Sequence, residues 1–177
     1  KALKTLSKVN KINPLYGRAF QEFGHNYVKL NNKEMALKSY SRAVRYNPSL
    51  QASWLGILGL DNAGKELIKL AEQNIIYLKN LPPELKSVLS FIHEDKLKKA
   101  DDLCRHFLKI SPHHIEAMKM LATICTKLHV YEDSEFLLES CLVFEPDNID
   151  ISIEYINLLI KRQKYSNALK HAKKLYR

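Results

Sequence analysis

Prolines recur along this chain at a nearly constant distance. They stand at 14, 48, 82–83, 112 and 146, and the successive spacings, with Pro82 counted for the pair, are 34, 34, 30 and 34 positions. A proline disfavours the α conformation in the residue before it, and it therefore ends a helix. A helix stop that returns at intervals of about 34 residues predicts a chain built from similar short repeats.

Between the prolines the apolar residues follow the helical period, and no stretch of strict alternation predicts a strand. The sequence thus predicts an all-α fold of about eleven helices, with a core formed by nearly all the periodic apolar residues, including Trp54, Phe107 and the three cysteines. The first helix stands alone and the others form pairs, at about 2–12, 16–30 and 33–46, 50–62 and 64–80, 83–93 and 96–109, 113–128 and 131–144, and 147–162 and 165–176.

The first complete pair resembles the tetratricopeptide-repeat (TPR) signature. Aromatic, small and closing residues stand at the family's positions in Phe20, Phe23, Gly24, Tyr27, Ala36, Tyr40, Ala43 and Pro48. The resemblance implies a right-handed α-solenoid in a single domain, 1–177. Its repeats would be a half repeat at 1–14 and full repeats at about 15–48, 49–83, 84–112, 113–146 and 147–177. Its third full repeat is expected to be about four residues short.

Charge is distributed unevenly. Lys and Arg exceed Asp and Glu by 28 to 19, a net charge of +9, but residues 1–50 carry +8, residues 101–150 carry −6 and residues 151–177 carry +6. A nucleic-acid site favours an unbroken basic stripe. The alternation therefore favours a protein partner, with self-association of a basic end on an acidic middle as a second expectation. Nucleic-acid binding through the basic terminal repeats is the alternative function.

Composition also bears on the compartment. Cys104, Cys125 and Cys141 lack metal-ligand spacing and are odd in number, which disfavours a disulfide scaffold and favours a reducing, cytoplasmic location. The longest nearly apolar stretch, around 54–60, is far shorter than the ~18 residues of a membrane span. We expect no membrane insertion.

Motifs that suggest catalysis are incomplete. The run from Gly59 to Lys65 has the glycine spacing of a phosphate-binding loop, but Glu66 replaces the required Ser or Thr and a helix precedes it. Cys104 and His106 point to different helix faces, so that no zinc site is predicted. Four acidic residues, Glu132, Asp133, Glu135 and Glu139, are interpreted as a solvated helix face. We expect no enzyme activity, cofactor or metal in this chain.

TPR proteins usually bind a peptide in a concave groove formed by the first helix of each repeat. By that resemblance, the candidate groove residues here are Arg18, Gln21, His25, Lys29, Leu55, Lys119, Thr123, Lys127, Ile153, Asn157 and Lys161. The variant that clamps a chaperone's terminal carboxylate is disfavoured, because its Asn partners are missing and Glu154 would repel an anion.

The later part of the chain, roughly 48–177, is also similar to bacterial proteins in which TPRs are fused to a sulfotransferase domain. The similarity is carried by short phrases at 81–85, 97–105, 112–118, 135–141, 146–148, 162–165 and 168–169. In that family the catalytic domain follows the repeats and uses the sulfate donor PAPS. The family's donor-binding loop has no counterpart here, so the resemblance implies a non-catalytic scaffold within a larger bacterial protein.

Overall fold

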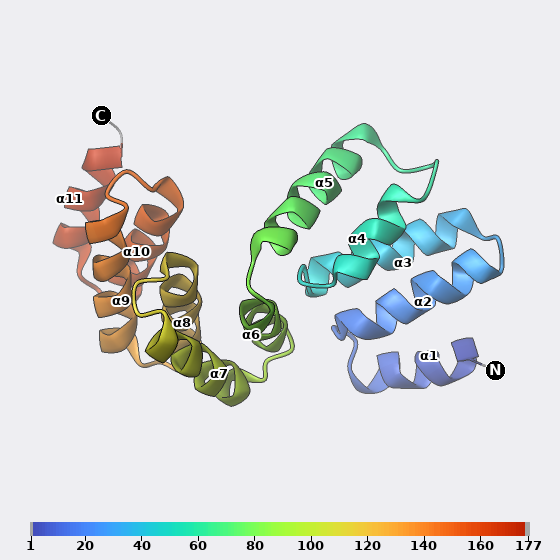
Figure 1. The fold of residues 1–177 in the computed structure, drawn as a ribbon, viewed down its shortest axis with the longest axis horizontal. Coiled ribbons are helices and arrows are strands. Elements are labelled where there is room, and N and C mark those ends of the chain that lie inside the picture. Colours follow the sequence, from blue (N-terminus) through green and yellow to red (C-terminus); the bar gives the residue numbers. More distant parts are fainter. Residues whose placement is uncertain (1, 176–177) are drawn as a thin grey trace. The chain divides into compact units, whose positions relative to one another are not determined.

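A computed structural model describes residues 2–175, apart from the side chain of Ala2. Over this range the chain is all-helical, with eleven helices and no strand, which confirms the predicted fold class (Figure 1). Residue 176, where the last helix was predicted to end, lies outside the described residues. The helices are α1 (Ala2–Ile12), α2 (Gly17–Lys29), α3 (Lys33–Tyr46), α4 (Gln51–Leu58), α5 (Lys65–Asn80), α6 (Pro83–His93), α7 (Leu97–Ile110), α8 (Ile115–Lys127), α9 (Tyr131–Phe144), α10 (Ile149–Lys161) and α11 (Tyr165–Leu175).

The chain forms two compact units, Lys1–Asp95 with α1 to α6 and Lys96–Arg177 with α7 to α11. Consecutive helices pack together from α1 to α5 in the first unit and from α7 to α11 in the second, as in a solenoid. The boundary between the units lies between α6 and α7, inside the repeat predicted at 84–112. The single domain and its repeat boundaries stay predictions, and the two units are described separately.

Four of the turns between helices contain one residue with a left-handed backbone conformation. Asn31, Asp95, His129 and Gln163 adopt positive φ angles of 56°, 56°, 62° and 59°, each two residues before the next helix begins. A left-handed residue at this place ends one helix and reverses the chain. The last three are evenly spaced, 34 positions apart. The repeat period is therefore visible in the turns as well as in the prolines.

The short repeat is distributed differently from our expectation. The first helices α2, α4, α6, α8 and α10 begin at 17, 51, 83, 115 and 149, so that successive starts are 34, 32, 32 and 34 positions apart. Two repeats are thus each two residues short, rather than one short by four. The prolines were misleading because Pro14, Pro48, Pro112 and Pro146 each stand three residues before a helix, whereas Pro83 is the first residue of α6, where a proline is well tolerated.

The core of the first unit is centred on Tyr40, which is 2% exposed. Its ring lies against two glycines, Gly24 of α2 and Gly56 of α4, where an added Cβ would overlap ring atoms. Its hydroxyl is 2.8 Å from Nδ1 of His25. Trp54, predicted as core, is buried in the same cluster and donates to the carbonyl of Pro48. The two glycines allow three helices to approach one aromatic ring.

Replacing Gly24 with alanine should therefore destabilise the first unit by about 1–3 kcal/mol, because the new methyl group meets the buried Tyr40 ring. Urea unfolding followed by the fluorescence of Trp54, the single tryptophan, measures the change. Gly59→Ala is the matched control, since its Cβ would be 3.6 Å or more from any neighbour. Equal midpoints for the two variants would contradict the assignment.

The second unit buries all three cysteines, as predicted for core residues, and leaves them unpaired with one another. Cys104 donates to the carbonyl of Ala117 at 3.2 Å, which fixes α7 against α8. Burial raises the pKa of the Cys104 thiol to about 12 and that of Cys141 to about 11. These thiols remain protonated at neutral pH, so that they act as small apolar core groups. Phe107, also predicted as core, is only half-buried.

The acidic face of α9 is mostly exposed, as interpreted from the sequence, with Glu132, Asp133 and Glu139 at the surface, but one of its four carboxylates is buried. Glu135 is buried and pairs with Arg162 and with Lys164, whose Nζ is 2.7 Å from Oε1. Glu139 accepts a 2.5 Å hydrogen bond from the hydroxyl of Tyr155. Only tertiary packing could show this, because the basic partners come from the turn between α10 and α11, about 30 residues away.

Among the described helices, none combines the length and apolarity that crossing a membrane requires.

Candidate functional site

The predicted groove residues all lie on first helices, and they divide between the two units. Arg18, Gln21, His25 and Lys29 are on α2 and Leu55 is on α4, all in the first unit. The other six are on two helices of the second unit: Lys119, Thr123 and Lys127 on α8, and Ile153, Asn157 and Lys161 on α10.

In the first unit, Arg18 and Gln21 line a polar pocket of about 310 Å³ together with Ser49, Leu50, Gln51, Ala52, Lys86, Ser87 and Ser90. The Arg18 guanidinium is already occupied. Its Nε is 2.5 Å from a carboxylate oxygen of Glu94, and its Nη2 donates to the Ser90 hydroxyl at 3.0 Å. This arginine therefore holds α6 against α2 and contributes little free charge to the pocket.

The other three predicted groove residues of this unit lie outside the polar pocket. His25 is hydrogen-bonded to the Tyr40 hydroxyl, so that it supports the core. Lys29 lies exposed at the end of α2, and Leu55 is exposed on α4. None of these three lines the polar pocket.

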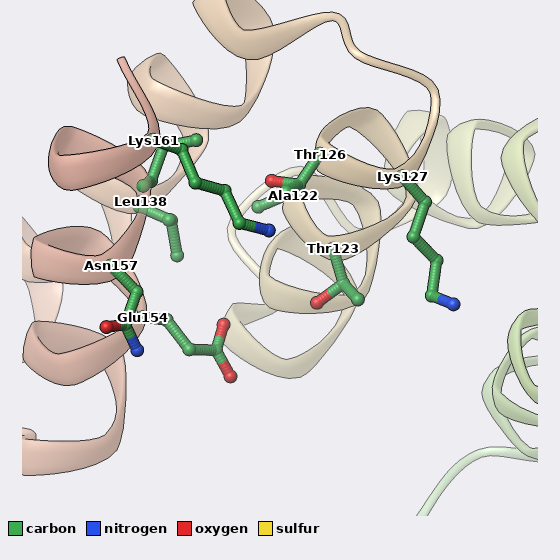
Figure 2. Close-up of a pocket in the computed structure, with 9 residues that line it drawn as sticks. Ala122, Thr123, Thr126, Lys127, Leu138, Glu154, Asn157 and Lys161 are labelled. Carbon is green, nitrogen blue, oxygen red and sulfur yellow. The ribbon is translucent and has the colours of Figure 1, made fainter. Parts of the chain in front are cut away.

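In the second unit, four predicted residues meet around one pocket of about 330 Å³. Thr123 and Lys127 of α8 and Asn157 and Lys161 of α10 line it (Figure 2). The remaining lining residues were not predicted: Ala122, Thr126, Leu138, Glu154 and Leu158. We call this the α8/α10 pocket. Four of these five lie three positions from a predicted residue on the same helix, so that the helical period could have identified them. Leu138 comes from α9 and could not have been identified in this way.

The pocket has an apolar floor and a charged rim. Ala122, Leu138 and Leu158 are buried, whereas Lys127 and Lys161 are exposed. The Thr123 hydroxyl donates to the carbonyl of Lys119, and Thr126 is 2.7 Å from the Ser134 hydroxyl. The two hydroxyls are thus engaged with the protein, and the rim presents two ammonium groups, one carboxamide and one carboxylate to a ligand.

The rim carboxylate belongs to Glu154, which points into the pocket (Figure 2). Desolvation by the surrounding protein raises its pKa, and the charges of Glu116 and Asp150 raise it further, although Lys119 opposes them. Lys119 itself pairs with Glu116 at 3.2 Å and does not line the pocket. Ile153 is exposed on α10, also outside the pocket lining.

The polar groups that line the pocket belong to two threonines, two lysines, one asparagine and one glutamate. Throughout residues 2–175 no group of three His, Cys, Asp or Glu side chains is arranged to hold a metal ion. An apolar floor with a few polar rim groups is the usual composition of a ligand-binding pocket.

The comparisons with known proteins give information on the fold only. No family model matches the chain, and no curated protein matches its sequence. Among solved structures, MamA from Desulfovibrio magneticus RS-1 is similar over 91% of this chain and 93% of its own, at 12% identity and a TM-score of 0.51. Human IFIT1, solved as a dimer with PPP-AAAA, is similar over 97% of this chain at 17% identity and a TM-score of 0.51.

This chain spans less than half of the IFIT1 chain, 44%. A third structure, YrrB, described as a TPR protein with an unusual peptide-binding site, shares 14% identity over 96% of this chain and 90% of its own, with a TM-score of 0.48. At such low sequence identity, a structural similarity is evidence for the fold alone. The fold is an all-helical α-solenoid.

Proposed function

We propose that this chain is a protein-interaction scaffold that binds a peptide segment of a partner through the first helices of its repeats. The observation that carries the proposal is the α8/α10 pocket, which is lined by equivalent positions of successive repeats, Thr123 and Asn157, and likewise Lys127 and Lys161. Neighbouring repeats thus form one site together, as a solenoid groove requires.

The chemistry of the pocket suggests the ligand. An apolar side chain fits the floor of Ala122, Leu138 and Leu158, and an acidic residue beside it would pair with Lys127 or Lys161. Glu154 opposes a second negative charge near Thr123. We therefore infer a ligand with an internal apolar–acidic pair rather than a free terminal carboxylate.

Reversing the charge of both rim lysines should weaken peptide binding. A peptide selected from a random library against the unaltered chain serves as the probe, and fluorescence anisotropy measures its affinity. We expect the double variant Lys127→Glu and Lys161→Glu to bind it about tenfold or more weakly, a loss of about 1.4 kcal/mol or more.

Lys170→Glu and Lys173→Glu together form the matched control, because both side chains are exposed on α11, outside the pocket. This pair should change the affinity less than about twofold. A similar loss in both double variants would assign binding to general attraction of charge, and failure to select any peptide would contradict the proposal directly.

The cellular compartment of the scaffold and the class of its partner form a separate part of the proposal. We infer a reducing, cytoplasmic compartment from the buried, unpaired thiols, and a protein partner rather than nucleic acid from the acidic stretch between two basic ones. The similarity of residues 48–177 to TPR–sulfotransferase proteins suggests that the scaffold serves such an enzyme. That link rests on the short sequence phrases and is independent of the pocket.

A further inference from the structure

A different pocket of the first unit shares no residue with the predicted groove. Helices α1 and α3 both pack on α2 (Figure 1). Residues of these three helices line a cavity of about 260 Å³. We call it the aromatic pocket. Its lining residues come from α1 with Ser7 and Asn10, from α2 with Phe20, Phe23 and Tyr27, and from α3 with Met35, Lys38, Ser39 and Arg42.

Aromatic rings form the α2 side of this pocket. Phe20 and Phe23 have ring centroids 6.2 Å apart, and Phe23 stacks on Tyr27 at 6.3 Å. Phe20 is buried, but Phe23 and Tyr27 are only half-buried. Such a row, reached from solvent, offers ring faces and edges to a further aromatic group in the offset or edge-on arrangements that such groups prefer.

A polar atom in the same pocket lacks a partner among the residues that the structure describes. The Oδ1 atom of Asn10 is buried from solvent and accepts no hydrogen bond from any of them. Buried acceptors are normally satisfied, so that this atom marks a place where a bound group would supply a donor. The indole N–H of a tryptophan side chain is a donor on an aromatic ring.

The rim of the pocket carries two cations, Lys38 and Arg42, both exposed on α3. Among the described residues neither forms an ion pair, whereas Arg18, Lys33, Arg105, Lys119, Arg162 and Lys164 each do. The Arg42 guanidinium instead lies over the Phe20 ring, 5.6 Å from its centroid. The surrounding segment, residues 1–50, has ten basic and two acidic side chains. The rim is thus complementary to negative charge.

We propose that the aromatic pocket binds an acidic peptide segment through one aromatic side chain, tryptophan fitting best. The ring would lie against Phe23 and Tyr27 and donate to Asn10, and flanking carboxylates would pair with Lys38 and Arg42. This site is made by α1 and α3 around α2 and shares no residue with the pockets of the proposed groove. It therefore gives the scaffold a second, independent contact with a partner.

The test uses a short fluorescein-labelled peptide with one tryptophan between glutamates. The unaltered chain should bind it, and replacing the peptide's tryptophan with alanine should weaken binding about tenfold, by the contribution of one stacked aromatic group. Lys38→Glu combined with Arg42→Glu should also weaken binding about tenfold or more. Asn10→Leu should weaken it about threefold or more, because it removes the acceptor.

Arg45→Glu with Lys79→Glu is the matched control, since both side chains are exposed in the first unit, neither lines the pocket, and neither forms an ion pair among the described residues. It should leave the affinity within about twofold. A photo-crosslinking version of the peptide locates the site without any substitution, and adducts should map to residues 7–42. The groove variant Lys127→Glu with Lys161→Glu should bind this peptide normally, which separates failure of this site from failure of the proposed function.

Several results would overturn the proposal. These are no binding by the unaltered chain, equal loss in the control pair, or adducts confined to the groove helices α8 and α10. Displacement of the peptide by a single-stranded oligonucleotide with steep salt dependence would instead assign the pocket to nucleic acid. A concentration-dependent dimer that is lost in the Lys38→Glu, Arg42→Glu variant would assign it to a second copy of the chain.

Discussion

Replacing Tyr40 with alanine should lower the free energy of unfolding of the first unit by about 3–5 kcal/mol, the usual cost of removing a large buried ring. The ring is 2% exposed and lies between α2 and α4 at Gly24 and Gly56. Neither glycine has a side chain that could fill the cavity left behind. Urea unfolding observed by Trp54 fluorescence reports on this unit, because Trp54 belongs to the same cluster.

Tyr40→Phe provides the control, since it keeps the ring and removes only the hydroxyl that is bonded to His25. We expect a cost of about 0.5–1.5 kcal/mol for this change. Gly24→Ala, destabilising on its own, should cost much less in the Tyr40→Ala chain, because the two sites share one contact. Equal costs for Tyr40→Ala and Tyr40→Phe, or additive costs for the double variant, would contradict the packing described.

Removing the buried carboxylate of the second unit should have the next largest effect. The Glu135 side chain is 12% exposed and faces both Arg162 and Lys164. Glu135→Ala leaves both cations without this partner, and we expect a loss of about 2–4 kcal/mol, less than for a fully buried pair because Lys164 is partly in water. Hydrogen exchange of α11 amides measures it, with exchange becoming faster as α11 loses its anchor on α9.

Glu132→Ala is the matched control, because Glu132 also pairs with Arg162, at 2.6 Å, but is 75% exposed. It should cost less than about 1 kcal/mol. If the α11 amides exchanged at the same rate in both variants, the ion pairs of Glu135 would not hold this helix.

The contribution of Glu135 should also depend on pH. Burial alone would raise its pKa, but the hydrogen bond from Lys164 and the charge of Arg162 outweigh burial, so that the pKa lies below its ordinary value of 4.5. A lowered pKa in the folded state stabilises the protein above the unfolded value. The stability difference between the unaltered chain and Glu135→Gln should be constant above about pH 5.5 and shrink as the pH falls below 4.5 through the folded value.

The sequence was informative where one residue type has one structural consequence. Pro14, Pro48, Pro112 and Pro146 each precede a first helix by three residues, and that regularity was enough to predict helical pairs and an all-α fold. It failed at Pro82 and Pro83, because a proline is compatible both with the loop before a helix and with its first turn. The left-handed turn residues are of four different types, namely Asn, Asp, His and Gln. No sequence pattern therefore revealed them.

The candidate site, like the fold, could be predicted from the sequence only in part. Helical periodicity placed Thr123, Lys127, Asn157 and Lys161 on first helices, and these four do line the α8/α10 pocket. Periodicity could not show that His25 is bonded to Tyr40 or Arg18 to Glu94, because those partners come from other helices. Whether a polar side chain is free for a ligand or engaged by the protein depends on contacts between distant segments.

The sequence by itself therefore determined the fold class, the helices and the faces on which polar residues lie, because these depend on neighbours within about one or two turns. Only the tertiary structure decided which charges are already paired and where pockets form. It showed Glu135 held by Arg162 and Lys164, and Lys38 and Arg42 with no carboxylate paired to them among the described residues. Pairing between charges depends on distances across helices, and those distances exist only once the helices have packed.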